Sequence, residues 1–279
     1  MQDILERASI DLGEVSETLM IPLWSRAMES ERRRGLLHDP KAREIVAALD
    51  YDFETRFAGR RHLAFRACLR TVLIDRWVRS FLAAHGEATV VEIGTGLNTR
   101  FERVDDGRVR WFDLDLPDSL ALRRRFFVDA PRRTMVEGAF GEDDWIGAIE
   151  VRGPVLFIAE AVLVYLDEAT VRRGLDALSR AFPGATFILD TVARSAVAGD
   201  AGPLMQRFRA PFVWGCDDPR ELEGWGHRLL ETATLDDLPR ELVRRLPLRR
   251  RLELPVLRRR RPELLRTHAL ARIELGPPG

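Results

Sequence analysis

The segment ATVVEIGTG, residues 88–96, constrains the fold more than any other part of this 279-residue chain. Its apolar, β-branched start is typical of a short buried strand, and that strand runs directly into Gly94 and Gly96. Glycines at the end of a parallel strand let the backbone turn sharply and approach a ligand closely. We therefore expect a strand of an open α/β sheet that ends at a ligand-binding loop.

Strand-like and helical segments alternate along the rest of the chain. The pattern predicts strands in residues 109–115, in the first half of residues 154–166 and in residues 185–192, with an amphipathic helix over residues 167–182. Strands that alternate with helices indicate a mostly parallel α/β sheet.

The two ends of the chain have sequence patterns that differ from this alternation. Residues 1–85 have mainly helical spacing, residues 195–225 are irregular and rich in Gly, Pro and aromatic residues, and residues 268–276 form a candidate last strand. The Arg/Leu-rich residues 240–261 are interpreted as a solvated, partly helical face.

Composition excludes several classes of function. The 44 basic residues match 44 acidic ones, whereas a nucleic-acid binder usually carries a basic excess, so no nucleic-acid partner is expected. No apolar run reaches the ~18–20 residues of a membrane helix, and the first residues lack the apolar region of a signal peptide. We expect a cytoplasmic protein without a membrane partner. Cys68 and Cys216 are isolated, so neither a metal site nor a disulfide is predicted.

Acidic residues follow the glycine loop at the distance expected for a nucleoside ligand. The loop reads GxGxNT, which lacks the third glycine of a dinucleotide site. About 20 residues further on, Asp113 and Asp115 lie at the end of the second predicted strand, where an acid can accept the ribose hydroxyls. Both acids lie on the same side of that strand, so spacing alone does not choose between them.

Glu160 is the third candidate, because it interrupts the apolar run FIAEAVLVYL. A buried carboxylate is costly unless it has a partner. Two interpretations stay open: Glu160 ends its strand at the ligand crevice, or it pairs with an arginine.

Together these segments resemble the leucine carboxyl methyltransferase family, and within it the polyketide O-methyltransferase branch. The likeness covers almost the whole chain in the expected order. It rests on ETLMIPLWSRA, DPKA, LDYDF and RTVLID before the loop, on EIGTGLNTR, WFDLDLP and AEAVLVYL, and on APFVWGCDDP near residue 215. Asn98 and Ala161 depart from the family pattern, which has Asp and Gly at these positions.

The resemblance implies an α/β, class I methyltransferase fold that binds S-adenosylmethionine and releases S-adenosylhomocysteine. It implies a mostly parallel seven-stranded sheet in residues 86–279, an N-terminal helical cap in residues 1–85, and a substrate-side insertion in residues 195–225. Arg70 would pair with the donor's carboxylate, Asp115 would take the ribose hydroxyls and Glu160 would meet the methionine or ribose end. The other donor-site residues would be Glu92, Gly94, Gly96, Asp113, Ala139 and Phe140, the last two beside the adenine.

The expected reaction is O-methylation of a small natural product, with a carboxylate as the acceptor. A carboxylate is already ionised at neutral pH and needs no general base, and none of the five histidines has a recognisable catalytic setting. Candidates for the acceptor pocket are Tyr165, Arg209, Phe212 and Trp214, although Phe212 and Trp214 also suit a core. The alternatives are methylation of a peptide or protein C-terminus, methylation of a phenol, and donor binding without catalysis.

Overall fold

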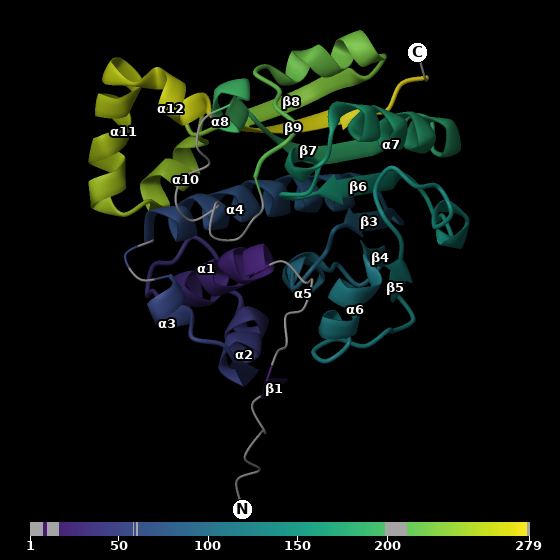
Figure 1. The fold of residues 1–279 in the computed structure, drawn as a ribbon, viewed down its shortest axis with the longest axis horizontal. Coiled ribbons are helices and arrows are strands. Elements are labelled where there is room, and N and C mark those ends of the chain that lie inside the picture. The colour runs from purple at the N-terminus through teal and green to yellow at the C-terminus, as the bar shows by residue number, and fades with distance from the viewer. Residues whose placement is uncertain (1–7, 10–16, 58, 60, 199–210, 278–279) are drawn as a thin grey trace, which may run out of the picture.

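A seven-stranded sheet organises the protein (Figure 1). The computed structural model describes residues 8–9, 17–57, 59, 61–198 and 211–277. The strand order is β5-β4-β3-β6-β7-β9-β8, and only β9 runs antiparallel to its neighbours. The strands are β3 (Thr89–Ile93), β4 (Arg110–Asp115), β5 (Arg133–Glu137), β6 (Val155–Ala159), β7 (Thr186–Val192), β8 (Arg228–Thr234) and β9 (His268–Glu274), with a separate pair of β1 (Ala8–Ser9) and β2 (Leu49–Asp50).

Helices surround this sheet on both faces and extend beyond its edge. The α-helices are α1 (Met20–Ser30), α2 (Pro40–Ala48), α3 (Phe53–Arg56), α4 (Arg61–Ala84), α5 (Arg100–Val104), α6 (Pro117–Arg123), α7 (Glu168–Ala181), α8 (Arg194–Ala198), α10 (Arg240–Arg245), α11 (Leu248–Arg260) and α12 (Pro262–Arg266). Short 3-10 helices are η1 (Glu17–Leu19), η2 (Ile146–Ala148), η3 (Leu163–Tyr165) and η4 (Pro219–Trp225). Within the described residues, no helix is both long and apolar enough to span a membrane.

The central strands are buried on both faces, which explains their continuous apolar sequences. Successive side chains alternate between the faces: Val91 packs into the cluster under α7, and Val90 into the cluster under α4 and α10. The same alternation holds in β6, where Phe157 and Leu156 belong to the two different clusters. The sheet is therefore the middle layer of a three-layer α/β fold.

The first helices form a third apolar cluster beside α4. Figure 1 shows α1, α2 and α3 on the opposite side of α4 from β8 and β9, and α1 packs directly on α4. Trp24 and Phe57 contact each other here with ring centroids 5.1 Å apart. The predicted boundary near residue 85 coincides with the end of α4. Because α4 also covers the sheet, the division of the chain into a cap and a core stays a prediction.

The chain changes direction within the sheet between β3 and β6. It runs outward from β3 to β4 and β5, and then returns to place β6 on the other side of β3. Such a switch point opens a crevice at the carboxyl ends of the two strands. The glycine loop follows β3 and Glu160 follows β6, so both predicted motifs meet at this crevice.

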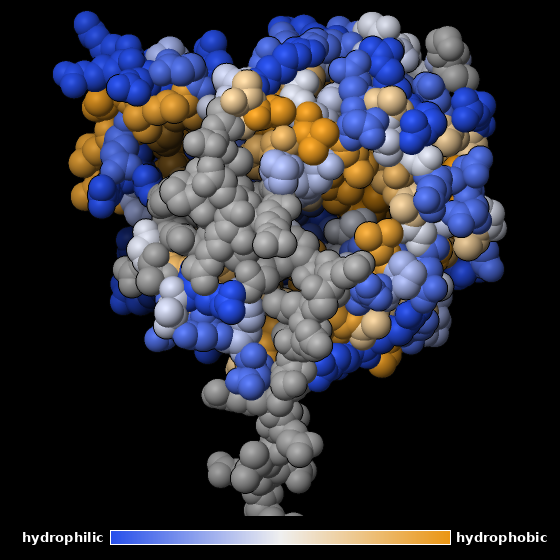
Figure 2. Space-filling view, viewed as in Figure 1, coloured by the Kyte–Doolittle hydropathy of each residue, from blue (hydrophilic) through white to orange (hydrophobic). Residues whose placement is uncertain are grey.

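The C-terminal helices carry apolar side chains into solvent. In the space-filling view of Figure 2 an apolar strip lies over α11, among arginines. It contains Leu248 and Leu252, which are 68% and 65% exposed, and Val256. Since α11 has no buried residue, the predicted solvated, partly helical face in residues 240–261 is confirmed for this helix.

Candidate active site

The glycine loop at the end of β3 requires glycine at two positions. Gly94 and Gly96 have φ values of +62° and +48°, which residues with a Cβ rarely adopt. A Cβ on Gly94 would lie 2.4 Å from Val162 Cγ2, and one on Gly96 would lie 2.7 Å from Leu19 Cδ2. The loop is thus packed between the segment after β6 and the start of the N-terminal helices.

The two acids at the end of β4 have different surroundings. Asp115 accepts hydrogen bonds from the backbone N–H groups of Gly96, at 2.6 Å, and Leu116, at 2.8 Å. Asp113 is completely buried and pairs with Arg123 at 3.1 Å and Arg133 at 2.6 Å. Although burial disfavours its charged form, these guanidinium groups hold the pKa of Asp113 below its usual value. Both acids therefore contact the glycine loop: Asp115 accepts from its backbone, and Asp113 accepts from the Thr95 hydroxyl at 3.1 Å while also pairing with two arginines.

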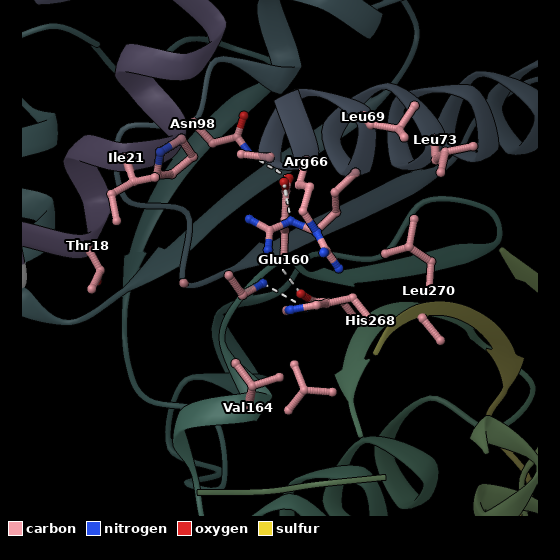
Figure 3. Close-up of a pocket in the computed structure, with 18 of the residues that line it drawn as sticks. Thr18, Ile21, Arg66, Leu69, Leu73, Asn98, Glu160, Val164, His268 and Leu270 are labelled. Carbon is pink, nitrogen blue, oxygen red and sulfur yellow. Dashed lines mark hydrogen bonds and ion pairs between the residues drawn. The ribbon is translucent and has the colours of Figure 1, made fainter. Parts of the chain in front are cut away.

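Glu160 lies at the crevice and is also paired with arginines, so both interpretations of its sequence apply. It faces the cavity shown in Figure 3. Its Oε1 accepts hydrogen bonds from Arg70 Nε and Thr71 Oγ1, each at 2.9 Å, and its Oε2 binds Arg100. Although burial opposes its charge, Arg70 and Arg100 hold the pKa of Glu160 well below its usual value. Arg70 also binds Asp190, with 3.2 Å between Nη1 and Oδ2.

The ion pairs continue from Glu160 into the N-terminal helices. Arg100 also binds Glu92 and Asp75, Asp75 binds Arg103 at 2.7 Å, and Arg103 binds Asp39 at 3.0 Å. These residues, together with Arg70, Asp190 and Arg26, are called the ion-pair network below. Burial raises the pKa of Glu92 to about 7 even though Arg100 is adjacent, and its Oε2 has no hydrogen-bond partner among the described residues. Glu92 is thus a member of this network, beneath the crevice.

A cavity of about 340 Å³ lies next to Glu160. One end is formed by the glycine loop and the N-terminal segment near Thr18, and the other by α4, η3 and β9. Tyr165 and Phe212 line it, with ring centroids 5.7 Å apart. The remaining lining is mostly apolar and includes Leu69, Leu73, Val164, Val192, Leu235 and Leu270.

Several other predicted residues are placed away from this cavity. Trp214 is 3% exposed and packs on Trp225 in the core, which favours the core interpretation of this residue. Phe140 is buried against Phe187, and the Ala139 carbonyl accepts a hydrogen bond from Trp145 Nε1 at 3.1 Å. Arg209 lies outside the described residues.

Two residues of the cavity wall were missed by sequence reasoning. His268, on β9, lines the cavity with its ring centroid 5.9 Å from that of Phe212, so one histidine does have a setting in the site. Burial, with Arg66 and Arg70 nearby, lowers the pKa of His268 to about 3. Arg66 lies one helical turn before Arg70 on α4, so both side chains lie on the same face of the helix. This four-residue spacing could have identified Arg66 from the sequence. No sequence signal shows that β9 enters the sheet beside β7.

Comparison with known proteins identifies the family. The leucine carboxyl methyltransferase model matches residues 20–179, a range that contains the glycine loop, Asp115 and Glu160. The chain belongs to the leucine carboxyl methyltransferase family. It is an S-adenosylmethionine-dependent methyltransferase, and the resemblance seen in its sequence is confirmed.

Two similar proteins and one solved structure agree with this family. The tetracenomycin polyketide synthesis O-methyltransferase of Streptomyces glaucescens is 32% identical over 83% of this chain and 87% of its own length. An S-adenosyl-L-methionine-dependent methyltransferase of Gibberella zeae is 27% identical over 78% of this chain and 81% of its own. The crystal structure of a DUF574-family protein of Streptomyces avermitilis has a TM-score of 0.59 at 13% identity, covering 93% and 97% of the two chains. The predicted α/β methyltransferase fold is confirmed.

The residues around the methyltransferase's crevice offer polar groups that could hold the donor. The two positive-φ glycines let the loop turn sharply at the crevice. Asp115 interacts with two backbone N–H groups and with Ser119, and a carboxylate has about four lone-pair sites, so it can still accept a ribose hydroxyl. Glu160 and Asp190 are both paired with Arg70, and their carboxylates lie on the cavity wall, where a donor amine could bind.

Proposed function

We propose that this methyltransferase transfers a methyl group to an oxygen of a small natural-product acid and forms a methyl ester. The S. glaucescens relative, by its name, is an O-methyltransferase of polyketide synthesis, which supports transfer to oxygen. The size and apolar lining of the cavity support a small organic acceptor.

The observation that carries the choice of a carboxylate is the lack of a usable general base among the described residues of the cavity wall. Burial raises the pKa of Tyr165 to about 12, so its phenol stays protonated at neutral pH. Burial and two arginines lower the pKa of His268 to about 3. Taking the proton of a phenol of pKa about 10 would then be uphill by roughly 10 kcal/mol.

The two carboxylates of the cavity wall are already engaged. Glu160 binds two arginines, and Asp190 accepts hydrogen bonds from Arg70 at 3.2 Å and from the Ala161 N–H at 2.7 Å. An acceptor that arrives ionised needs neither group as a base. A carboxylate, with a reference pKa near 4, meets that condition.

In this proposal the chain acts by binding and alignment. The donor, when bound, would supply a methyl group on a sulfonium; the acceptor oxygen would attack the methyl carbon in line with the carbon–sulfur bond, and the thioether would leave. The residues that would hold the donor are Gly94, Gly96, Asp115, Glu160 and Arg70. Arg70 uses Nε and Nη1 to bind Glu160 and Asp190, and its guanidinium would also take the donor's carboxylate. Ala139 and Phe140 would border the adenine, whereas Glu92 and Asp113 would support the loop from below.

The apolar walls provide the second requirement, which is exclusion of water. Tyr165 and Phe212 would stack on a planar acceptor. Both rings line the same cavity as Glu160, which supports an acceptor site next to the proposed donor site.

The test is the chemistry of the product. Purified protein is incubated with methyl-labelled S-adenosylmethionine and a panel of aromatic and polyketide-like acids that also carry phenols, and the labelled product is then treated with mild base. We expect base to release the label as methanol, because an ester hydrolyses and an aryl ether does not. A base-stable labelled product would refute the carboxylate proposal. Tight donor binding with no labelled product from any acid would instead favour a donor-binding protein without catalysis.

A further inference from the structure

Arg66 is a cation of the cavity wall that has no counter-charge among the described residues. It lies on α4 and lines the cavity together with Arg70, four residues further along the helix (Figure 3). Its Nη2 is fully buried and has no hydrogen-bond partner among the described residues. Burial, with a smaller effect from the nearby Arg250, lowers the pKa of Arg66.

Every other charged group of the described cavity wall is matched. Arg26 pairs with Asp39 at 3.0 Å, and Arg70 pairs with both Glu160 and Asp190. His268 adds no negative charge: burial, with smaller effects from Arg66 and Arg70, lowers its pKa and keeps the imidazole neutral. The end of the cavity near Arg66 therefore has a net positive charge that nothing in the described part of the chain neutralises.

An unpaired guanidinium in a partly buried site is costly, because it loses hydration and gains no partner. We propose that Arg66 binds an anionic, carboxylate-class group of the acceptor and thereby selects acidic acceptors. This proposal rests on the proposed function only in taking the cavity as the acceptor site. Leu69, Leu73 and Leu270 of the same wall would contact the apolar part of the acceptor.

The contact with Arg66 also distinguishes substrate from product when the bound carboxylate is the group that is methylated. A carboxylate oxygen forms the new bond to carbon with its lone pair, the carbon–sulfur bond breaks, and its electron pair stays on sulfur. The ester that results carries no charge, so it loses the charge-assisted hydrogen bond to Arg66. An acid should therefore bind more tightly than its own methyl ester, which favours release of the product.

The experiment uses the full chain and three probes: 1-naphthoate, its uncharged methyl ester, and S-adenosylhomocysteine. Their binding is measured by calorimetry and thermal shift for the wild type, Arg66→Met, Arg66→Lys and the matched control Arg250→Met. Arg250 is near Arg66 but pairs with Glu253 and does not line the cavity. We expect the wild type to prefer naphthoate over its ester by about ten- to a hundredfold, as a charge-assisted hydrogen bond would give.

Arg66→Met should abolish this preference, Arg66→Lys should keep part of it, and Arg250→Met should keep most of it. Without ligand, Arg66→Met should melt at the same temperature as the wild type or higher, because it removes an unpaired charge; a clearly lower melting temperature would indicate a structural role and overturn the proposal.

Two further results would overturn the proposal. One is an equal affinity of the wild type for naphthoate and its ester. The other is a loss of S-adenosylhomocysteine binding in Arg66→Met, which would assign the anion to the donor. A base-stable labelled product would refute the proposed ester formation but would not change the preference for naphthoate over its ester. The two proposals can therefore be refuted separately.

Discussion

Ala161 shows how the site holds a single residue under strain. Its φ of +55° makes it the one non-glycine residue with positive φ in the described part of the chain. The left-handed conformation costs an alanine roughly 1–2 kcal/mol. Its N–H donates to Asp190 Oδ1 at 2.7 Å, so the ion-pair network maintains the strained turn right after Glu160.

Ala161→Gly should stabilise the protein by up to about 1 kcal/mol. Glycine relieves the left-handed strain and loses part of that gain to its greater freedom in the unfolded chain. Urea denaturation followed by circular dichroism measures the change. Ala169→Gly, at an exposed position of α7, is the matched control and should destabilise by about 1 kcal/mol. An equal loss in both variants would contradict the assignment of strain.

His268 should make stability fall as the solution is acidified. Its pKa is about 6.5 in the unfolded chain and about 3 in the folded protein, so below pH 6.5 only the unfolded chain takes up the proton. Between pH 7 and pH 5 this group alone should remove about 2 kcal/mol of stability. His268→Asn removes this dependence, so the difference between the two unfolding curves measures it. An imidazole that titrates near pH 6.5 in the folded protein by NMR would refute this prediction.

At the scale of elements, α5 connects three parts of the fold through its first residue. Arg100 binds Glu92 at the end of β3, Asp75 on α4 and Glu160 after β6, and its side chain is fully buried. Loss of its charge would leave three buried carboxylates without a shared partner.

Arg100→Met should therefore destabilise the protein by about 3–5 kcal/mol, the range for breaking a buried ion pair on one side. Arg108→Met is the control, because Arg108 pairs with Asp106 in solvent, at 2.8 Å, and its loss should be close to neutral. Chemical denaturation of both variants against the wild type measures the difference. Equal midpoints would mean that the network contributes little to stability.

The sequence predicted the central strands and missed those at the sides. β3, β6 and β7 are buried on both faces, and their continuous apolar runs are a strong signal. β8 is an edge strand with a single buried residue, and β5 begins with the buried charge of Arg133, which pairs with Asp113. A continuous apolar run arises only where a strand is buried among apolar side chains. Strands that are largely exposed, or that contain a buried charged residue, lack this run and are not recognised from the sequence.

At the scale of the molecule, the motif residues of the N-terminal helices belong to the same structure as the glycine loop. Arg26, Asp39 and Asp75 belong to motifs that carry the family resemblance but were given no individual role from sequence. All three lie in the ion-pair network that joins these helices to the sheet. The glycine loop, Asp115 and Glu160 could be located from the local sequence pattern, because each stands at the end of an apolar run. Arg66 and His268 needed the fold, since contacts between residues 66 and 268 depend on where β9 enters the sheet.

Donor binding should stabilise the whole molecule. At a hundred times its dissociation constant, a ligand that binds only the folded state adds about 2.7 kcal/mol, which corresponds to a rise in melting temperature of roughly 5–10 °C for a protein of this size. Scanning calorimetry with S-adenosylhomocysteine measures the shift, and adenine alone is the control and should give a much smaller one. A melting temperature that does not respond would contradict the assigned donor site.

The position of β9 between β7 and β8 has a consequence for synthesis. β8 leaves the ribosome before β9 exists, and it has no strand to pair with until residues 268–274 follow. During that interval the nascent chain exposes an unpaired strand, a state prone to aggregation. The segments that follow β8, namely α10 and α11, are rich in arginine. Repulsion between these positive charges on neighbouring chains would oppose aggregation. We expect ribosome-bound chains stalled before residue 268 to be digested by protease at β8, and chains released after residue 274 to resist.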